Sequence, residues 1–417
     1  MLRPSTGRLL LLLPTATYRA TAFVEAARRL GVALTVASEL PSTFEQAQPD
    51  ALVTLDFSDP ERAALQATEF ARRYPIAGVI GVDDDGAVVA AAIAGRLGLK
   101  GNPPAAALAA RDKHVQRREL ARHGVPVPRF ELHRLDEDVM QLAARVHYPC
   151  VLKPLRLAAS RGVIRADDAP GFAAAFARVK GILEQTGCER SILVEDFVPG
   201  PEVALEGLVI DGRLALLGLF DKPDPLDGPF FEETIYVTPS RLPAPAQLEL
   251  ARCGEAAVAA LGVREGPIHA ELRHNARGPW LIELAARPIG GRCSAVLRFT
   301  AGEEGRENGE TYSLEELIIR HALGMPLPVL EREQRAAGVM MIPVPGAGVL
   351  REVRGIAEAR AVPLVEDVAI TAHPGEALVP WPEGSRYPGF IFARGETPEA
   401  VEGALRAAHG RLTFVLQ

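Results

Sequence analysis

Two glutamates, Glu271 and Glu283, have the spacing expected of paired ligands for a divalent cation. Apolar runs on either side of the turn-forming residues 275–278 predict an antiparallel β-hairpin. If His274 faces Trp280 across this hairpin, counting back along both strands places Glu271 opposite Glu283. Carboxylates opposed at about 5 Å repel each other. Mg²⁺ would relieve the repulsion, because it binds one or two carboxylates together with the oxygens of a nucleotide.

The same hairpin would gather further polar groups beside the two glutamates, because side chains alternate between the faces of a strand. Arg287 continues this face if the strand persists, and it could reach the same phosphates. The alternative interpretation is a solvated hairpin with scattered charges. The residues expected to share the face are His269, Glu271, Arg273, Leu281, Glu283 and Ala285.

Two earlier segments carry further candidate ligand-binding residues. Lys153 ends an apolar run and precedes small residues at 157–163, and a lysine with backbone N–H groups in such a loop can hold phosphates. Glu202, Ala204 and Glu206 then share one face of a predicted strand, although paired glutamates at such positions are usually solvated. Basic loops are also common on surfaces, so neither segment identifies a site alone.

Composition argues against several classes of function. The net charge is −7 and there is no long basic run, so a nucleic-acid partner is not supported. Four scattered cysteines without metal-ligand spacing indicate reduced thiols. No stretch approaches the roughly 18 apolar residues of a membrane span. We therefore expect a soluble cytoplasmic protein that acts on small molecules.

The elements that must position these residues begin with alternating strands and helices over residues 1–100. This alternation predicts a parallel, Rossmann-like sheet with helices on both faces. The first strand-to-helix turn, 14–18, lacks GxGxxG, so a dinucleotide site is not supported. Asp83-Asp84-Asp85-Gly86 follows a strand end, where it is either a ligand-binding turn or a helix N-cap. The predicted strands are 9–13, 32–37, 51–55 and 78–82, and the predicted helices are 20–30, 60–73 and 87–97.

Two further units are expected after this N-terminal domain. Residues 101–335 mix helices and strands, with a small lobe at about 148–200. Residues 336–417 hold short apolar runs separated by Pro and Gly, which predicts a β-rich extension. The expected fold class is therefore α/β and α+β in several domains.

Taken together, the segments resemble the ATP-grasp superfamily over residues 1 to about 330. Within it the chain is most similar to L-amino acid ligases, through the runs 222–234 and 283–291 and the β-rich extension. The resemblance rests on five segments in a fixed order: Asp112-Lys113, 151–154, Arg161-Gly162-Val163, 194–202, and Glu271 with Glu283 and Arg287.

The resemblance implies a central two-lobe domain that binds ATP and Mg²⁺, with Mn²⁺ able to substitute. Glu271 and Glu283 would hold the metal, and Arg287 would bind the transferring phosphoryl group with help from Lys153. Adenine would meet the backbone near Glu195 and Val198 with Phe197 against its ring, and the ribose would meet Glu202. The nucleotide-binding residues implied are Lys113, Lys153, Ser160, Arg161, Gly162, Val163, Glu195, Phe197, Val198 and Glu202.

The resemblance also implies an enzyme that forms C–N bonds. ATP would convert a carboxylate to an acyl phosphate, and an amine would attack it to give an amide or dipeptide with release of ADP and phosphate. One departure from the commoner pattern is Ala285, where asparagine is usual. The metal site would then rely on its two glutamates and phosphate oxygens, or recruit His269. The substrate-binding residues expected are Glu233 and Tyr236 for an α-amino group, Gly290, Gly291 and Arg292 for an α-carboxylate, and His269 and Arg287.

Two other functions remain open from the sequence. One is an ATP-dependent carboxylase of the same fold, related to the purine pathway or to biotin carboxylases. The other is a catalytically silent ATP-binding protein. We expect a homodimer, the commonest assembly of soluble oligomers.

Overall fold

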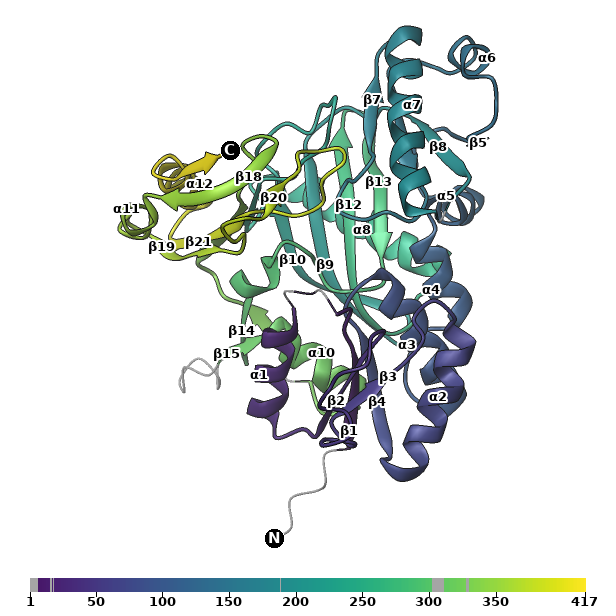
Figure 1. Cartoon of the computed structure of the whole chain (residues 1–417), viewed down its shortest axis with the longest axis vertical. Helices are drawn as coiled ribbons and strands as arrows, with labels where there is room; N and C mark the ends of the chain where they lie inside the picture. Colours follow the sequence, from purple (N-terminus) through teal and green to yellow (C-terminus); the bar gives the residue numbers. More distant parts are fainter. Residues whose placement is uncertain (1–6, 16, 18, 188, 302–310, 328–329) are drawn as a thin grey trace.

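The structure is a computed structural model built around three principal sheets. Figure 1 shows the N-terminal domain at one end of the long axis, the small antiparallel sheet at the other, and the long strands of the central sheet between them. The residues described are 7–15, 17, 19–187, 189–301, 311–327 and 330–417.

The N-terminal domain is the parallel sheet that the alternation predicts. Its elements are β1 (Arg8–Leu12), α1 (Ala20–Leu30), β2 (Leu34–Ser38), β3 (Leu52–Thr54), α2 (Pro60–Arg73), β4 (Ile76–Gly81) and α3 (Asp84–Leu97). The strands are all parallel, in the order β3-β2-β1-β4. Leu9 and Leu11 of β1 pack with α1, whereas Leu10 and Leu12 pack with α2 and α3. Burial of β1 on both faces explains its unbroken run of leucines.

The small lobe is an antiparallel sheet with the order β5-β8-β6-β7. Its strands are β5 (Phe130–Arg134), β6 (Cys150–Pro154), β7 (Ile164–Ala166) and β8 (Ser191–Asp196), and its helices are α6 (Val139–Ala143) and α7 (Ala169–Thr186). Phe172 and Val179 of α7 pack with Leu152 and Val194 of the sheet. Helices α4 (Pro104–Arg111) and α5 (Lys113–Arg122) precede the lobe. The Asp112 side chain accepts hydrogen bonds from the N–H groups of His114 and Val115, so Lys113 opens α5.

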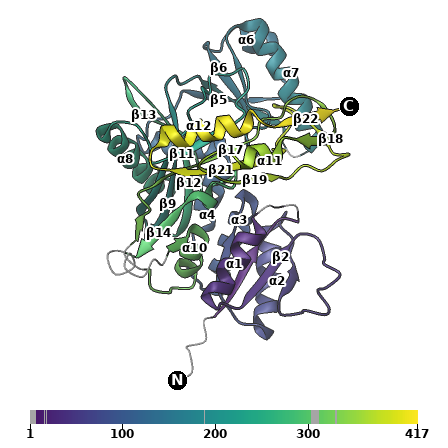
Figure 2. The ribbon, with the colours of Figure 1, turned by 90° about the vertical axis from the view of Figure 1, so that its left-hand side faces the viewer.

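The central sheet has eight strands and carries polar side chains on one face. In spatial order its strands are β13 (Gly278–Ala285), β12 (Gly266–Asn275), β9 (Glu202–Ile210), β10 (Arg213–Asp221), β11 (Ile235–Thr238), β17 (Ala336–Met341), β21 (Gly389–Gly395) and β19 (Val365–Ile370). Helices α8 (Ala244–Leu261) and α12 (Pro398–His409) pack against one face, and Figure 2 shows α12 lying across the strands. Val203 and Leu205 of β9 point to the α8 side. Glu202 and Glu206 therefore point to the opposite face.

The β12–β13 hairpin brings Glu271 opposite Glu283, as predicted, but through a different register at its tip. Asn275 pairs with Gly278 and His274 with Pro279, one residue away from the predicted pairing of His274 with Trp280. A bulge between Glu271 and Leu272 restores the predicted register at the glutamates. The bulge also corrects one expectation, because Leu281 pairs with Leu272 and lies in the core with α8 rather than on the polar face.

The β-rich extension is confirmed, and three of its strands, β17, β21 and β19, belong to the central sheet. The sheet therefore continues across the boundary predicted at residue 335. Two helices also occur there, α11 (Ile356–Arg360) and α12. The remaining elements are η1 (Cys293–Val296), β14 (Arg298–Ala301), β15 (Thr311–Ser313), α10 (Leu314–Ala322), β16 (Leu330–Arg332), β18 (Gly348–Arg354), β20 (Ala377–Leu378) and β22 (Thr413–Leu416).

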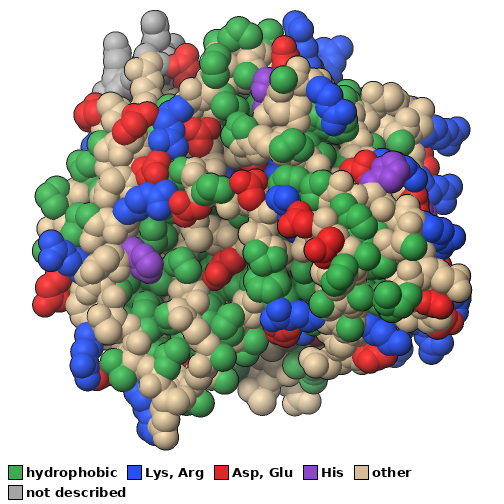
Figure 3. Space-filling model, turned by 90° about the horizontal axis from the view of Figure 1, so that it is seen from above, with side chains coloured by type: hydrophobic (Ala, Val, Ile, Leu, Met, Phe, Trp, Pro, Cys, Tyr) green, Lys and Arg blue, Asp and Glu red, His purple; other side chains and the backbone are tan. Residues whose placement is uncertain are grey.

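The surface and the cysteines agree with the composition. Figure 3 shows acidic and basic side chains interspersed on the face that it presents. Among the described residues, no helix is long and apolar enough to cross a membrane. Cys150, Cys253 and Cys293 are buried free thiols, and Cys188 lies outside the described residues.

Candidate active site

A cavity of about 790 Å³ lies where the N-terminal domain, the small lobe, the central sheet and the C-terminal segment meet. Most of the residues predicted from the sequence line it, although they come from segments far apart in the chain. These residues are Lys113, Lys153, Ser160, Val163, Glu195, Phe197, Val198, Glu202, Glu233, Tyr236, His269, Glu271, Glu283, Arg287, Gly290 and Gly291.

Glu271 and Glu283 project into this cavity with one lysine beside each. Oε1 of Glu283 lies 3.0 Å from Nζ of Lys113, and Oε1 of Glu271 lies 3.0 Å from Nζ of Lys222. Oxygens of Glu271, Glu202 and Glu233 also lie within 4.8 Å of one another. The ammonium of Lys222 contacts all three of these glutamates. Glu283 lies outside this cluster, so what suits Mg²⁺ or Mn²⁺ in the opposed pair is the hard carboxylate chemistry of its two members.

Lys222, which sequence reasoning did not assign to the site, is the cation that holds its carboxylates together. Its ammonium contacts Glu202 at 2.7 Å, Glu233 at 2.7 Å and Glu271 at 3.0 Å. Burial opposes the charged form, but the three glutamates outweigh it and raise the pKa of Lys222 well above its ordinary value. One signal was available, because Lys222 ends an apolar strand in the same way as Lys153.

His269 lies between two of the glutamates, Glu206 and Glu271. Its Nδ1 bonds Glu206, and its Nε2 lies 3.6 Å from Oε1 of Glu271. Burial alone would lower the pKa of His269, but Glu206 and Glu271 raise it to about 9. His269 therefore lies beside Glu271, and its part in the metal site stays a prediction.

Lys153 and Glu195 form a buried network with Arg117 behind the loop 157–163. Nζ of Lys153 lies 2.7 Å from Oε2 of Glu195, and Arg117 binds the other oxygen. Burial would raise the pKa of Glu195, but Arg117 and Lys153 lower it below its ordinary value. The network fixes Lys153 at the cavity wall. It also engages both carboxylate oxygens of Glu195.

The aspartates that follow β4 were expected to form either a ligand-binding turn or a helix N-cap. Asp83 caps α3 by accepting a hydrogen bond from the N–H of Gly86 at 2.7 Å. Asp84 faces the cavity and accepts a hydrogen bond from Nε of Arg287 at 3.0 Å. Burial would raise the pKa of Asp84, but Arg287, Arg111 and Lys113 lower it to about 2. The turn is thus both a helix cap and a wall of the cavity.

Three predicted residues do not line the cavity. The guanidinium of Arg292 lies over the rings of Phe390 and Phe392, at 5.6 and 5.1 Å. Arg161 donates from Nε to the carbonyl of Glu383, and the N–H of Gly162 is bonded to the carbonyl of Pro382. Contacts with the C-terminal segment, which the sequence did not place nearby, account for all three.

Phe197 and Glu202 line the cavity, but protein cations engage both side chains. Guanidinium groups of Arg165 and Arg273 lie over the Phe197 ring at 4.2 and 5.0 Å. Glu202 accepts a bond from Nε of Arg273 at 2.8 Å in addition to its contact with Lys222. Arg273 was expected on this face but was not assigned a role.

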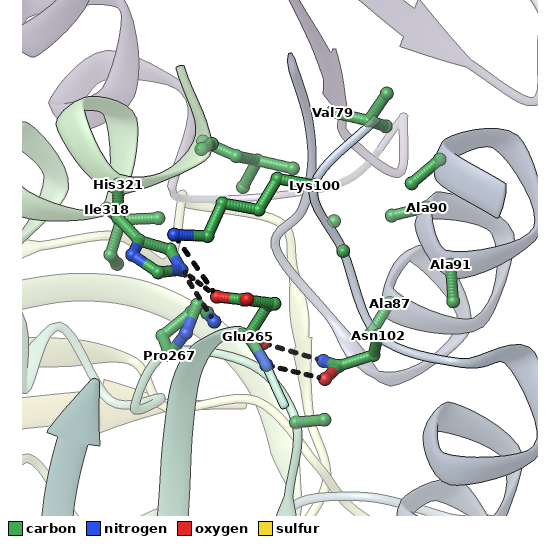
Figure 4. Close-up of a pocket in the computed structure, with 17 residues that line it drawn as sticks. Val79, Ala87, Ala90, Ala91, Lys100, Asn102, Glu265, Pro267, Ile318 and His321 are labelled. Carbon is green, nitrogen blue, oxygen red and sulfur yellow. Dashed lines mark hydrogen bonds and ion pairs between the residues drawn. The ribbon is translucent and has the colours of Figure 1, made fainter. Parts of the chain in front are cut away.

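A second cavity, of about 60 Å³, lies at the junction of the N-terminal domain, β12 and α10 (Figure 4). The Asn102 side chain bonds the backbone N–H groups of Arg264 and Glu265 and the carbonyl of Glu265. The Glu265 carboxylate lies 3.4 Å from Nζ of Lys100 and 3.0 Å from Nε2 of His321. This cavity is separate from the larger one and joins three segments of the fold.

Family models match three successive parts of the chain. They describe an ATP-grasp N-terminal domain at residues 24–101, an ATP-grasp domain at residues 146–296, and an L-amino acid ligase C-terminal domain 2 at residues 340–417. The chain contains an ATP-grasp domain. The large cavity of this ATP-grasp protein is lined by residues from all three matched parts.

Among solved structures, the ATP-grasp protein is similar to an L-amino acid ligase. The crystal structure of L-amino acid ligase from Bacillus licheniformis is 26% identical with a TM-score of 0.78, and the match covers 100% of both chains. N5-carboxyaminoimidazole ribonucleotide synthetase from Thermotoga maritima shares the fold at 16% identity, with a TM-score of 0.68 over 99% of this chain and 100% of its own.

Two curated relatives are ligases or synthases. Alanine--anticapsin ligase of Bacillus subtilis is 28% identical over 47% of this chain and 45% of its own length. Carnosine synthase 1 of Homo sapiens is 28% identical over 63% of this chain and 34% of its own length. The match therefore spans less than half the length of each of these relatives.

Proposed function

We propose that this protein is an ATP-dependent carboxylate–amine ligase that joins amino acids, or another carboxylate and amine, through an acyl phosphate. The observation that carries the proposal is the opposed pair Glu271 and Glu283 in one cavity with Lys113, Lys153 and Arg287. Acidic ligands for a divalent ion and cations for phosphoryl oxygens are what phosphoryl transfer requires. Similarity to an L-amino acid ligase over the whole chain supports an amide product.

In the proposed reaction the protein positions its substrates and neutralises their charge. A carboxylate oxygen attacks the γ-phosphorus of ATP and ADP leaves; an amine nitrogen then attacks the acyl carbon, loses a proton and displaces phosphate. Lys113 and Lys153 bind phosphate oxygens, and Arg287 holds the phosphoryl group during its transfer. Mg²⁺ bound between Glu271 and Glu283 would supply further positive charge at the same oxygens.

Glu233 is the proposed anchor for the α-ammonium group of an amino acid. It lines the cavity with Tyr236 behind it and has Nζ of Lys222 at 2.7 Å. Burial raises the pKa of Glu233 to about 7, Lys222 opposes that rise and Glu271 adds to it. An incoming ammonium group would favour the ionised form. The backbone of Gly290 and Gly291 is the proposed partner of the α-carboxylate. Arg292 has no part in this contact, because it does not line the cavity.

The test is phosphate release from ATP and Mg²⁺ with pairs of L-amino acids, followed by mass spectrometry of the products. We expect phosphate release that depends on both amino acids, with one amide formed for each phosphate. Phosphate release that requires bicarbonate would support a carboxylase instead. ATP binding without turnover across the whole panel would support a silent binding protein and contradict the ligase.

A further inference from the structure

The loop 157–163 is attached to the C-terminal segment by one turn, residues 381–383. The indole N–H of Trp381 donates to the carbonyl of Ala159 at 2.7 Å. Two more hydrogen bonds follow, from the N–H of Gly162 to the carbonyl of Pro382 at 2.8 Å and from Nε of Arg161 to the carbonyl of Glu383 at 3.0 Å. The turn thus holds the loop at three positions near its tip, Ala159, Arg161 and Gly162.

The tip of this loop has an uncommon backbone conformation. Ala159 and Ser160 have φ angles of 55° and 53°, in the left-handed region that residues with a Cβ rarely occupy. The start of the loop is fixed separately, because Lys113 donates from its N–H to the carbonyl of Leu155 at 3.1 Å and from Nζ to that of Leu157 at 3.0 Å. At the tip, the N–H of Arg161 is bonded to the carbonyl of Ala158 and that of Val163 to the carbonyl of Ser160, and the turn 381–383 adds contacts from outside the loop.

Trp381 joins this turn to the wall of the cavity. Its side chain is buried, and its ring lies 4.8 Å from that of Tyr387, which lines the cavity. The Tyr387 ring in turn lies 6.3 Å from that of Phe390, another lining residue. The indole therefore packs on the cavity wall through its ring and holds the loop through its N–H.

We propose that Trp381 is a positioning residue that keeps the loop 157–163 closed over the phosphates of ATP. This inference rests on the proposed function, since it takes the loop to cover the phosphates. A closed loop excludes water from the acyl phosphate. Where water enters, its oxygen adds to the acyl carbon, the bond to the phosphate oxygen breaks, and carboxylate and phosphate leave without an amide.

The test variant is Trp381→Phe, which removes the indole N–H but keeps an aromatic ring packed against Tyr387. The matched control is Trp280→Phe, because the chain has two tryptophans and Trp280 lies at the tip of the β12–β13 hairpin with its N–H on Asn275. In the control protein Trp381 is the sole tryptophan, so its fluorescence also reports on the loop when ATP and Mg²⁺ are added.

We expect Trp381→Phe to weaken ATP binding about three- to tenfold, as the loss of one hydrogen bond would. It should also release more than one phosphate per amide, whereas Trp280→Phe should match the native protein in both respects. The emission of Trp381 should change on addition of ATP. Equal ATP affinity in the two variants would overturn the inference even if no amide is formed by any of the proteins. Weaker ATP binding with no amide from the native protein would support the positioning role and count against the ligase.

Discussion

Glu283 and Glu271 differ in their surroundings although the sheet pairs them. Glu271 is held by Lys222 and His269, whereas Glu283 is bound to Lys113 and its side chain is 32% exposed. Glu283 is therefore the partner whose replacement breaks fewer ionic contacts, since its one ion pair is with Lys113. This makes it the sharper probe of the proposed metal site.

We expect Glu283→Ala to reduce Mg²⁺-dependent phosphate release by more than about 100-fold, because changes beyond the direct ligands of a metal already cost 10–100-fold. Phosphate release is measured at several Mg²⁺ concentrations. Glu249→Ala is the control, since Glu249 lies on α8 with its side chain half exposed and binds His274. Native activity in Glu283→Ala would remove this residue from the metal site.

Lys222 contacts three carboxylates at once, so its removal should be strongly destabilising. We expect Lys222→Met to lower the free energy of unfolding by about 3–5 kcal/mol, the usual result of breaking a buried ion pair on one side. Adding Glu233→Gln should restore part of the loss, since one uncompensated charge disappears.

Chemical denaturation at pH 7 measures this effect. The control is Lys180→Met, because Lys180 lies 3.9 Å from Glu184 in an exposed pair on α7, and such a pair contributes about 0–1 kcal/mol. An equal loss in the two lysine variants would show that the glutamates do not depend on Lys222.

At the scale of elements, the hairpin that bears the glutamates lies at the edge of the central sheet and is held there by α5. The Gln116 side chain donates to the carbonyl of Leu284 at 2.6 Å and accepts from its N–H at 3.0 Å. The Gln116 side chain thereby pairs with the backbone of β13 as a residue of a neighbouring strand would. An edge strand otherwise presents unpaired backbone groups.

We expect Gln116→Ala to lower the free energy of unfolding by about 1–3 kcal/mol for each backbone group left unsatisfied, and to reduce turnover because Leu284 follows Glu283. Denaturation curves and phosphate release together measure the effect. Gln141→Ala serves as the control, because Gln141 is exposed and bonds only Asp138 nearby. A variant of native stability would show that β13 does not depend on Gln116.

At the scale of the whole molecule, the junction in Figure 4 joins the N-terminal domain to β12 and α10. There the buried His321 accepts a hydrogen bond from the N–H of Gly266 at 3.1 Å. Burial and Lys100 lower the pKa of His321 to about 4. In the unfolded chain the His321 side chain binds a proton as the pH falls through about 6.5, whereas the folded chain keeps this side chain neutral there. The contribution of neutral His321 to stability is therefore complete above about pH 6.5 and is lost as the pH falls toward its lowered pKa.

We expect this titration to remove about 1–3 kcal/mol of unfolding free energy between pH 6.5 and pH 4. Denaturation at a series of pH values measures it. His321→Asn, whose amide oxygen can still accept from Gly266, should flatten this part of the profile. His123→Asn, at an exposed site, should leave the profile unchanged. If the native protein, His321→Asn and His123→Asn lost stability equally as the pH fell, His321 would be excluded as the source of the pH dependence.

Much of the fold and site followed from local patterns. The leucine run of β1, the strand and helix spacing of residues 8–97, and the hairpin at 266–285 each reflect nearest-neighbour geometry. The pairing of Glu271 with Glu283 was predictable because a short turn leaves few registers. Even so, the predicted strand pairing at the tip of the hairpin was wrong by one residue, because the amino-acid composition does not show where a β-bulge occurs. The domain boundaries, the residue roles and the homodimer stay predictions.

The sequence by itself determined which elements form, that acidic and basic residues at strand ends would gather, and the family that they resemble. Only the tertiary structure decided that Lys222 binds Glu271 from 49 residues away, that Asp84 binds Arg287, and that Trp381 reaches the loop at Ala159. Such contacts join segments whose separation in sequence carries no periodic signal. They depend on how sheets and lobes pack, which is set by burial over the whole chain rather than by any local pattern.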